Sequence, residues 1–216
     1  MTGLMMKDAF VMRKTLRLYA LFLLFYSGLA VLGVFPMSMA LAMVEVIVMV
    51  LPISSFSYDE AAKWDRYAAV LPVGRTAVVK ARYLFLLLVL LAAAAIGLVG
   101  SILASLLARE DLGELLATLL VSMGLGLMIA DIMLPVVYQL GPERARPWMY
   151  VIIFAPIVVL LGGAKLGLFD GIDLSWLDQL PELAVLGVFA LVPLVPLVGM
   201  LLSCWISCRI YARKEF

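Results

Sequence analysis

Six apolar runs, each close to the length that crosses a lipid bilayer, constrain the fold of this chain more than any other feature. A hydrocarbon core about 30 Å thick requires roughly 20 apolar residues of helix. The runs lack the alternation of apolar and polar residues that marks membrane-barrel strands, and backbone groups in lipid must bond within their own segment. The sequence therefore predicts an all-α polytopic membrane protein, one domain over residues 1–216, with transmembrane helices at about 18–35, 37–54, 83–107, 115–138, 148–169 and 183–208.

The composition supports a membrane protein and argues against a catalytic or metal-binding site on this chain. The chain is 66% hydrophobic and 14% charged, whereas soluble domains are about half apolar and a quarter charged. It contains no histidine, which is the commonest general base and metal ligand. Cys204 and Cys208 are the two cysteines, too few for a disulfide framework or a zinc site. We therefore expect no catalytic residue, cofactor or metal on this chain, and no nucleic-acid partner.

The basic residues are distributed very unequally between the two sides of the predicted bundle. Six spans place both termini on one side, and fourteen of the sixteen Lys and Arg residues fall on that side. The opposite side has only Arg109 and Lys165. Because short cytoplasmic loops are enriched in Lys and Arg, we expect a multi-pass protein of the cell membrane with both termini in the cytoplasm.

A polar stretch, SYDEAAKWDRYAAVLPVGR, separates the second and third predicted spans at residues 57–75. Ser57 and Glu60 fit a capping box, and Asp59 and Lys63 have the spacing of a helical ion pair. Trp64 lies on an apolar face that ends before Pro72. We therefore predict a separate cytoplasmic helix at about 57–71. Its aromatic residues would either bind a partner protein or lie among the lipid headgroups.

The run from Phe56 to Leu84 closely resembles the cytoplasmic segment of small six-span permeases of the type 2 ABC exporter superfamily. The resemblance lies in the phrases F-S-Y-D-E, K-W-D-R-Y, L-P-V and an arginine in the turn that follows. This chain departs from the family at Ala81-Arg82. In the family a small residue often stands directly before the tyrosine, where this chain has Arg82. In this family the segment is the coupling helix that docks on a separate ATPase subunit. The resemblance assigns that docking to Tyr58, Asp59, Glu60, Lys63, Trp64, Asp65, Tyr67 and Arg75.

This assignment predicts a division of roles within the helix. Buried aromatic residues supply most of the binding energy at interfaces, while charged residues fix the register. We therefore expect Trp64 to be the anchor in an ATPase pocket with Tyr67 beside it. The acidic and basic residues of the segment would orient the helix on its partner.

The resemblance also implies a function. The chain would be the permease subunit of a bacterial ABC exporter that moves an amphipathic or hydrophobic substrate outward, with antimicrobial or cytolytic peptides as the favoured class. No G-x-x-x-x-G-K-[ST] loop is present, so ATP and Mg²⁺ would bind to a separate P-loop ATPase. A second permease copy or a paralogue would complete the pathway. The alternative is a membrane scaffold or sensor subunit that recruits a cytoplasmic signalling protein through the same helix.

Two acidic residues lie within predicted spans. Charge at membrane depth is costly and usually faces protein or water, so Glu45 and Asp131 are candidates for the substrate pathway. The alternative for each is a structural hydrogen bond between helices. Gly124 and Gly126 are small residues of the kind that allow close helix packing.

The first residues of the chain mix apolar and basic side chains. Residues 5–19 are consistent with an amphipathic helix at the cytoplasmic surface ahead of the first span. A basic flank without a helix of its own is equally consistent with this pattern.

Overall fold

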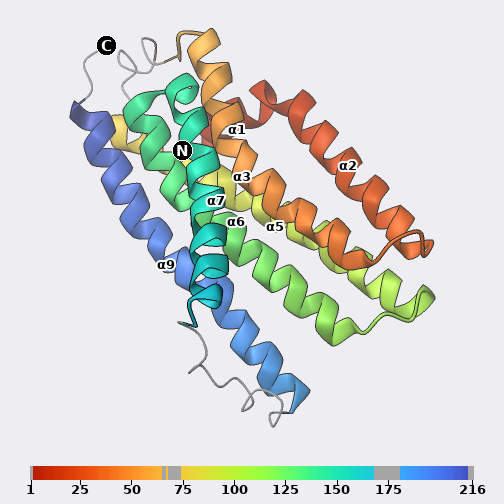
Figure 1. The fold of residues 1–216 in the computed structure, drawn as a ribbon. Coiled ribbons are helices and arrows are strands. Elements are labelled where there is room, and N and C mark those ends of the chain that lie inside the picture. The colour runs from red at the N-terminus through yellow and green to blue at the C-terminus, as the bar shows by residue number, and fades with distance from the viewer. Residues whose placement is uncertain (1, 65–66, 68–73, 168–180, 214–216) are drawn as a thin grey trace.

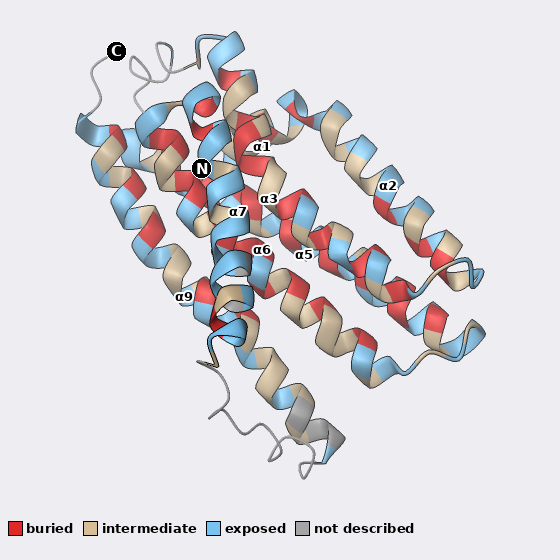
Figure 2. Cartoon of the chain, viewed as in Figure 1, coloured by how far each residue is buried: buried red, intermediate tan, exposed pale blue. Residues whose placement is uncertain are grey.

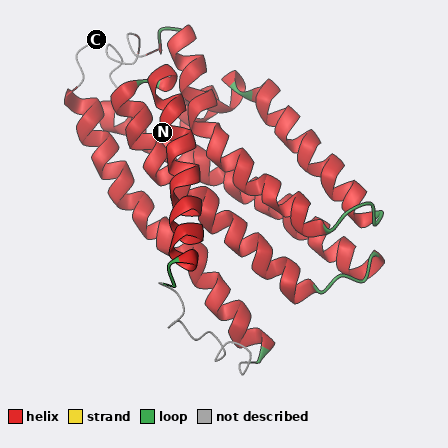
Figure 3. Ribbon diagram, viewed as in Figure 1, coloured by secondary structure: helices red, strands yellow, loops and turns green. Residues whose placement is uncertain are grey.

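The computed structural model describes residues 2–64, 67, 74–167 and 181–213. In these ranges the chain is helical and has no strand (Figure 3). The helices are α1 (Thr2–Val11), α2 (Arg13–Val31), α3 (Met37–Ala61), α5 (Arg75–Leu107), α6 (Leu112–Leu140), α7 (Pro142–Lys165) and α9 (Glu182–Arg213). Most of the predicted helix at 57–71 lies outside the described residues.

Each predicted span coincides with one long helix, from α2 through α9 in chain order (Figure 1). Six of the described helices are long and apolar enough to cross a membrane. The predicted all-α polytopic fold with six spans is therefore confirmed. The helices extend past several predicted ends, most clearly where α5 begins at Arg75 and α3 continues to Ala61.

Tight connections join the helices at the end of the bundle away from α1. Gly33, with φ of +75°, ends α2, and the amides of Gly33 and Val34 bond back to the carbonyls of Ala30 and Leu29. This is the glycine-dependent termination expected of a helix that must turn at once. The carboxylate of Glu110 accepts the first amide of α3, from Met37, at 3.2 Å. The α2–α3 turn is thereby tied to the α5–α6 loop.

Helix α6 lies at the centre of the bundle, and its most extensive contacts are with α9 and α3. A side chain at Gly124 would meet the backbone of Val192 in α9 at 2.9 Å. One at Gly126 would lie 3.3 Å from the Cα of Glu45 in α3. The prediction that these glycines permit close packing is confirmed. Because lipid provides no hydrophobic force between helices, such close contact is a main source of their association.

The outer helices are covered much less than α3, α5 and α6. Figure 2 shows α2 and α7 largely exposed, with buried positions concentrated on the helices between them. Phe25 in α2 and Phe154 in α7 are more than half exposed. Exposed apolar residues of this kind are expected on surfaces that face lipid.

The N-terminal residues form two helices rather than one. Helix α1 ends at Val11 and α2 begins at Arg13, with Met12 buried between them at 1% exposure. Helix α1 packs on α5 and places Asp8 in the protein interior. The expected helix is present, but it is folded against the bundle and contributes a buried charge.

The expectation of a new helix starting at Ser57 is wrong. The α3 helix continues without interruption through Ser57, whose hydroxyl donates to the carbonyl of Ile53 at 2.9 Å and caps no helix. The helix ends at Ala61, and Lys63 has φ of +50°. Lys63 therefore cannot form the helical i, i+4 pair with Asp59.

The α6–α9 contact generates a test of the fold. In Gly124→Ala the new methyl group would lie 2.7 Å from Cγ1 of Val192 and 2.9 Å from its backbone, so the helices must separate. We expect a loss of about 1–3 kcal/mol, the usual cost of overpacking. The measurement is thermal unfolding in detergent. The matched control is Gly187→Ala in α9, where no atom lies within 4 Å, and its midpoint should be unchanged or higher. Equal midpoints for both variants would contradict the close approach.

Candidate coupling and pathway sites

A buried cluster of four charged side chains joins α1, α3 and α5. Lys7 Nζ lies 2.7 Å from Asp8 Oδ1 and 2.8 Å from Asp59 Oδ1. Arg82 Nη2 lies 3.3 Å from Asp8 Oδ1 and also bonds to Asp59 Oδ2. The cluster contains two positive and two negative groups, so its charges balance.

The position of this cluster gives it structural importance. Asp59 is in the last turn of α3, and Arg82 is in the third turn of α5, so the cluster joins the two helices that flank residues 62–74. Lys7 and Asp8 add α1 to the same junction. Any displacement of the 62–74 segment must therefore act on three helices that are bonded to one another.

Aromatic rings extend the junction to the centre of the bundle. The Arg82 guanidinium lies 4.4 Å from the ring centroid of Phe56, and Phe56 packs edge-on against Tyr138 of α6 at 4.6 Å. Tyr138 in turn contacts Tyr211 of α9 at 5.5 Å. The charged cluster is thus packed continuously onto α6 and α9, the helices that form the central contact.

Burial makes the cluster sensitive to the loss of a single member. The side chains of Arg82, Asp8 and Asp59 are only 5%, 6% and 10% exposed. Removing one partner of a buried pair costs about 3–5 kcal/mol, because it leaves an uncompensated charge in a medium of low polarity. Removing the opposite charges together costs much less.

The residues predicted to face an ATPase occupy different environments. Asp59 is buried in the charged cluster, where it forms ion pairs with Lys7 and Arg82. Tyr58 is 40% exposed and Tyr67 is 63% exposed. Glu60, Lys63 and Arg75 are also exposed, and Arg75 donates a hydrogen bond to the carbonyl of Ala212. Asp65 lies outside the described residues.

Trp64 lies against the protein rather than projecting from it. Its ring packs on the core, and Lys7 Nζ lies 4.3 Å from the ring centroid. Its indole nitrogen is buried and has no hydrogen-bond partner among the described residues. A cation above a tryptophan ring contributes about 0.5–2 kcal/mol, depending on its desolvation. Trp64 therefore holds the start of the 62–74 segment to α1.

Sequence reasoning did not identify Lys7, Asp8 and Arg82 as site residues. From the sequence, Arg82 is singled out only as a departure from the pattern of the resembling permeases, and Asp8 is not singled out. One signal was available: an arginine within a long apolar helix requires acidic partners. The sequence does not indicate which acids supply them, because Asp8 and Asp59 are 74 and 23 residues away.

A second polar group lies deeper, where α5, α6 and α9 meet. The Tyr83 hydroxyl lies 2.6 Å from the Ser203 hydroxyl and 2.8 Å from that of Ser207. The Ser203 hydroxyl donates to the backbone carbonyl of Asp131 at 2.5 Å. These bonds connect three spanning helices through hydroxyl groups.

The two acids predicted for the pathway face different neighbours. Oδ2 of Asp131 is buried, has no hydrogen-bond partner among the described residues, and lies close to Gly199 of α9. Glu45 is half-buried, and its backbone packs beside Gly126 of α6. Neither carboxylate forms an ion pair with another described residue, and no contact joins the two. Among the described residues, no group of three possible metal ligands occurs.

The charged cluster generates a test of its structural role. In Arg82→Gln, the carboxylates of Asp8 and Asp59 lose a shared cation, and we expect a loss of about 3–5 kcal/mol in unfolding free energy. The matched control is Lys80→Gln, two residues earlier on the exposed side of α5, which should change stability by no more than about 0.5 kcal/mol. Thermal unfolding of the purified protein measures both.

A compensating variant separates the loss of pairing from the loss of packing. Asp8→Asn combined with Arg82→Gln removes one charge of each sign, so much of the lost stability should return. If the double variant is no more stable than Arg82→Gln alone, the charges are not what holds the junction together.

Comparison with known families agrees with this architecture. A family model described as "ABC-2 family transporter protein" matches residues 3–212. No curated protein and no solved structure matches the chain. The family match covers all six spanning helices, the charged cluster and the polar group around Asp131. The chain therefore belongs to the ABC-2 family of transporter proteins and is a membrane permease subunit of that family.

Proposed function

We propose that this permease couples ATP hydrolysis on a separate P-loop subunit to the outward movement of an amphipathic or hydrophobic substrate. The observation that carries the proposal is the charged cluster of Lys7, Asp8, Asp59 and Arg82. It joins both helices that flank residues 62–74, so a displacement of that segment is passed to α3 and α5 together. A transporter whose energy source lies on another subunit requires a connection of this kind.

The coupling follows from the stiffness of the junction. A closing ATPase would displace the 62–74 segment, and the buried pairs resist separation because each unpaired charge is costly. A displacement of the segment would therefore act on α1, α3 and α5 together. The Phe56–Tyr138 contact, at 4.6 Å between centroids, would transmit this motion to the central helix.

The exposed residues of the segment define the surface that would meet the ATPase. Tyr67 is the large aromatic residue with the greatest exposure here, at 63%, whereas Trp64 is held by Lys7. We therefore assign the anchoring role to Tyr67 and a positioning role to Trp64. Tyr58, Glu60 and Lys63 would form the polar rim that sets register.

The acidic groups near the middle of the spans support a substrate class. Glu45 and Asp131 lie within the apolar parts of α3 and α6, and neither pairs with a described cation. A cationic amphipathic peptide would match that combination of apolar surface and negative charge. Antimicrobial and cytolytic peptides have this chemistry, and they are the substrate class that the sequence resemblance favours.

The assembly and orientation belong to the same proposal. Two copies of the chain, or one copy and a paralogue, would enclose the pathway, with the ATPases beneath the end that carries α1. The concentration of basic residues at that end supports a cytoplasmic location for both termini. A scaffold or sensor subunit could use the same exposed residues to recruit a signalling protein, so the experiments below include ATPase activity.

The docking surface generates a test with two matched aromatic substitutions. Tyr67→Ala should weaken binding of the co-expressed P-loop ATPase by about 30-fold, the effect of losing an interface anchor worth about 2 kcal/mol. Trp64→Ala should retain the ATPase while lowering the thermal midpoint of the permease, because it releases the segment from Lys7. Quantitative co-purification and thermal unfolding measure the two effects.

Lys63→Ala is the control for this pair, since an exposed rim charge changes affinity little and mainly alters salt dependence. If Trp64→Ala no longer co-purifies with the ATPase while its thermal midpoint is unchanged, Trp64 rather than Tyr67 is the interface anchor. Retention of the ATPase, with coupled transport, in both aromatic variants would contradict docking through this segment. Recruitment of a protein without ATPase activity would favour the scaffold.

The pathway assignment generates a separate test. Asp131→Asn and Glu45→Gln preserve side-chain size and remove the negative charge. If the carboxylates attract a cationic peptide, each variant should lower substrate-stimulated ATPase activity about tenfold, corresponding to about 1.4 kcal/mol. Basal ATPase activity and assembly should be retained. An unchanged response to substrate in both variants would show that the acids have structural roles only.

A further inference from the structure

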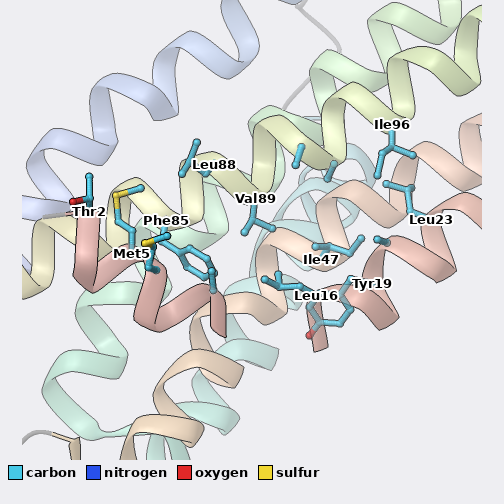
Figure 4. A pocket seen from close by; sticks show the side chains of 15 residues that line it. Thr2, Met5, Leu16, Tyr19, Leu23, Ile47, Phe85, Leu88, Val89 and Ile96 are labelled. Carbon is cyan, nitrogen blue, oxygen red and sulfur yellow. The ribbon is translucent and has the colours of Figure 1, made fainter. Parts of the chain in front are cut away.

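An apolar groove lies between the N-terminal helices and α5. Its volume is about 630 Å³, and it is lined by residues of α1, α2 and α5 together with Ile47 of α3. Figure 4 shows Met5, Leu16, Tyr19 and Val89 around the space between these helices. Ligand sites commonly have volumes of 300–1,000 Å³, so the groove is large enough to bind an extended molecule.

The dimensions of the groove match a single leaflet of a bilayer. Its lining on α5 extends from Phe85 to Ile96, which is about 17 Å at 1.5 Å per residue. Half of a bilayer core is about 15 Å thick. A second hollow of about 470 Å³ continues along α2 and α5 and shares Ile96 with the first. An apolar channel of this length between two spanning helices suits an acyl chain.

Two basic residues of α2 are neighbours of residues that line the groove. Arg13 precedes Leu16 by three residues and Arg17 precedes Ala20 by three, and residues so spaced are neighbours on a helix surface. Both arginines are exposed, and neither pairs with a described acid. Asp8 and Asp59 are already bound by Lys7 and Arg82. Within the described part of the chain, the two arginines therefore have no acidic partner.

We propose that this groove binds one acyl chain of an anionic glycerophospholipid, with the phosphate group held by Arg13 and Arg17. The apolar lining selects a hydrocarbon chain, and the two guanidinium groups select a negative headgroup over a zwitterionic one. Anionic lipid is attracted to basic residues at the cytoplasmic surface. A lipid in this position would lie beneath α1 and hold it against α5. It would thereby support the junction to which Lys7 and Asp8 contribute.

The test is lipid retention by the purified permease, which requires neither substrate nor ATPase. The protein is reconstituted in vesicles containing equal amounts of phosphatidylglycerol and phosphatidylcholine, then extracted in detergent, and the lipid bound per chain is measured by mass spectrometry. The wild-type chain should retain phosphatidylglycerol preferentially. Arg13→Gln with Arg17→Gln should lower that retention about fivefold for each cation removed. Arg144→Gln with Arg146→Gln, which removes two exposed cations from α7, is the matched control.

A second pair of variants tests the acyl-chain site. Ala92 lines the groove, so Ala92→Trp should fill it and lower retention of both lipids. The control is Leu91→Trp on the same helix, at a residue that is 51% exposed and lines neither hollow. Both proteins are first checked for an unchanged thermal midpoint. A Trp variant that fails this check is replaced by Ala92→Phe, with Leu91→Phe as its control.

Several results would overturn the proposal. One is equal retention of the two lipids by the wild-type chain. Another is retention in the Arg13, Arg17 variant that equals the wild-type value or that of the Arg144, Arg146 control. If Ala92→Trp changes the oligomeric state and leaves lipid retention unchanged, the groove is an interface between copies of this chain instead.

Discussion

The neutral cluster of Lys7, Asp8, Asp59 and Arg82 is the interaction on which the junction of α1, α3 and α5 depends. Its members come from three helices, and Asp8, Asp59 and Arg82 are almost fully removed from solvent, so loss of one partner leaves a costly unpaired charge. The cluster fixes the exit of α3, the entry of α5 and the position of α1 in a single arrangement. The surrounding features, including the packing of Trp64 under Lys7 and of Arg82 on Phe56, follow from that arrangement.

The centre of the bundle is held by a different kind of force. Around Gly124 and Gly126, α6 approaches α9 and α3 so closely that even a methyl group would reach their backbones. Within lipid, such close contact replaces the hydrophobic effect that drives packing in water. The charged cluster and the glycine contacts meet through Phe56, Tyr138 and Tyr211, which connect α3 to α6 and α9. This continuity allows a change at one end of the bundle to reach its centre.

The inner and outer helices of the bundle differ in how much of their surface is buried. The α3, α5 and α6 helices are the most buried, whereas α2, α7 and the outer side of α9 present large apolar surfaces outward (Figure 2). A permease that changes shape needs rigid groups that move against each other, rather than uniform packing. The charged cluster joins α1, α3 and α5 into one such group, and the close contacts of α6 with α3 and α9 attach that group to the centre of the bundle. The hydroxyl bonds of Tyr83 with Ser203 and Ser207 add a direct connection between α5 and α9.

The sequence by itself determined the class of this protein, the number of its spans and the family that the stretch from Phe56 to Leu84 resembles. These depend on local quantities, namely the lengths of the apolar runs and the charges between them. An apolar run of about 20 residues has the length of a helix that crosses the bilayer core. It also identified Gly124 and Gly126 as contact positions, because small residues in spanning helices have few other uses. Only the tertiary structure decided which of the candidate coupling residues are available to a partner. Asp59 and Trp64 share the same polar stretch as Tyr67, yet they are taken up by Lys7 and Arg82, more than 15 residues away along the chain. Pairings over such separations leave no periodic signal in the sequence, because they depend on where helices lie relative to one another in the folded bundle.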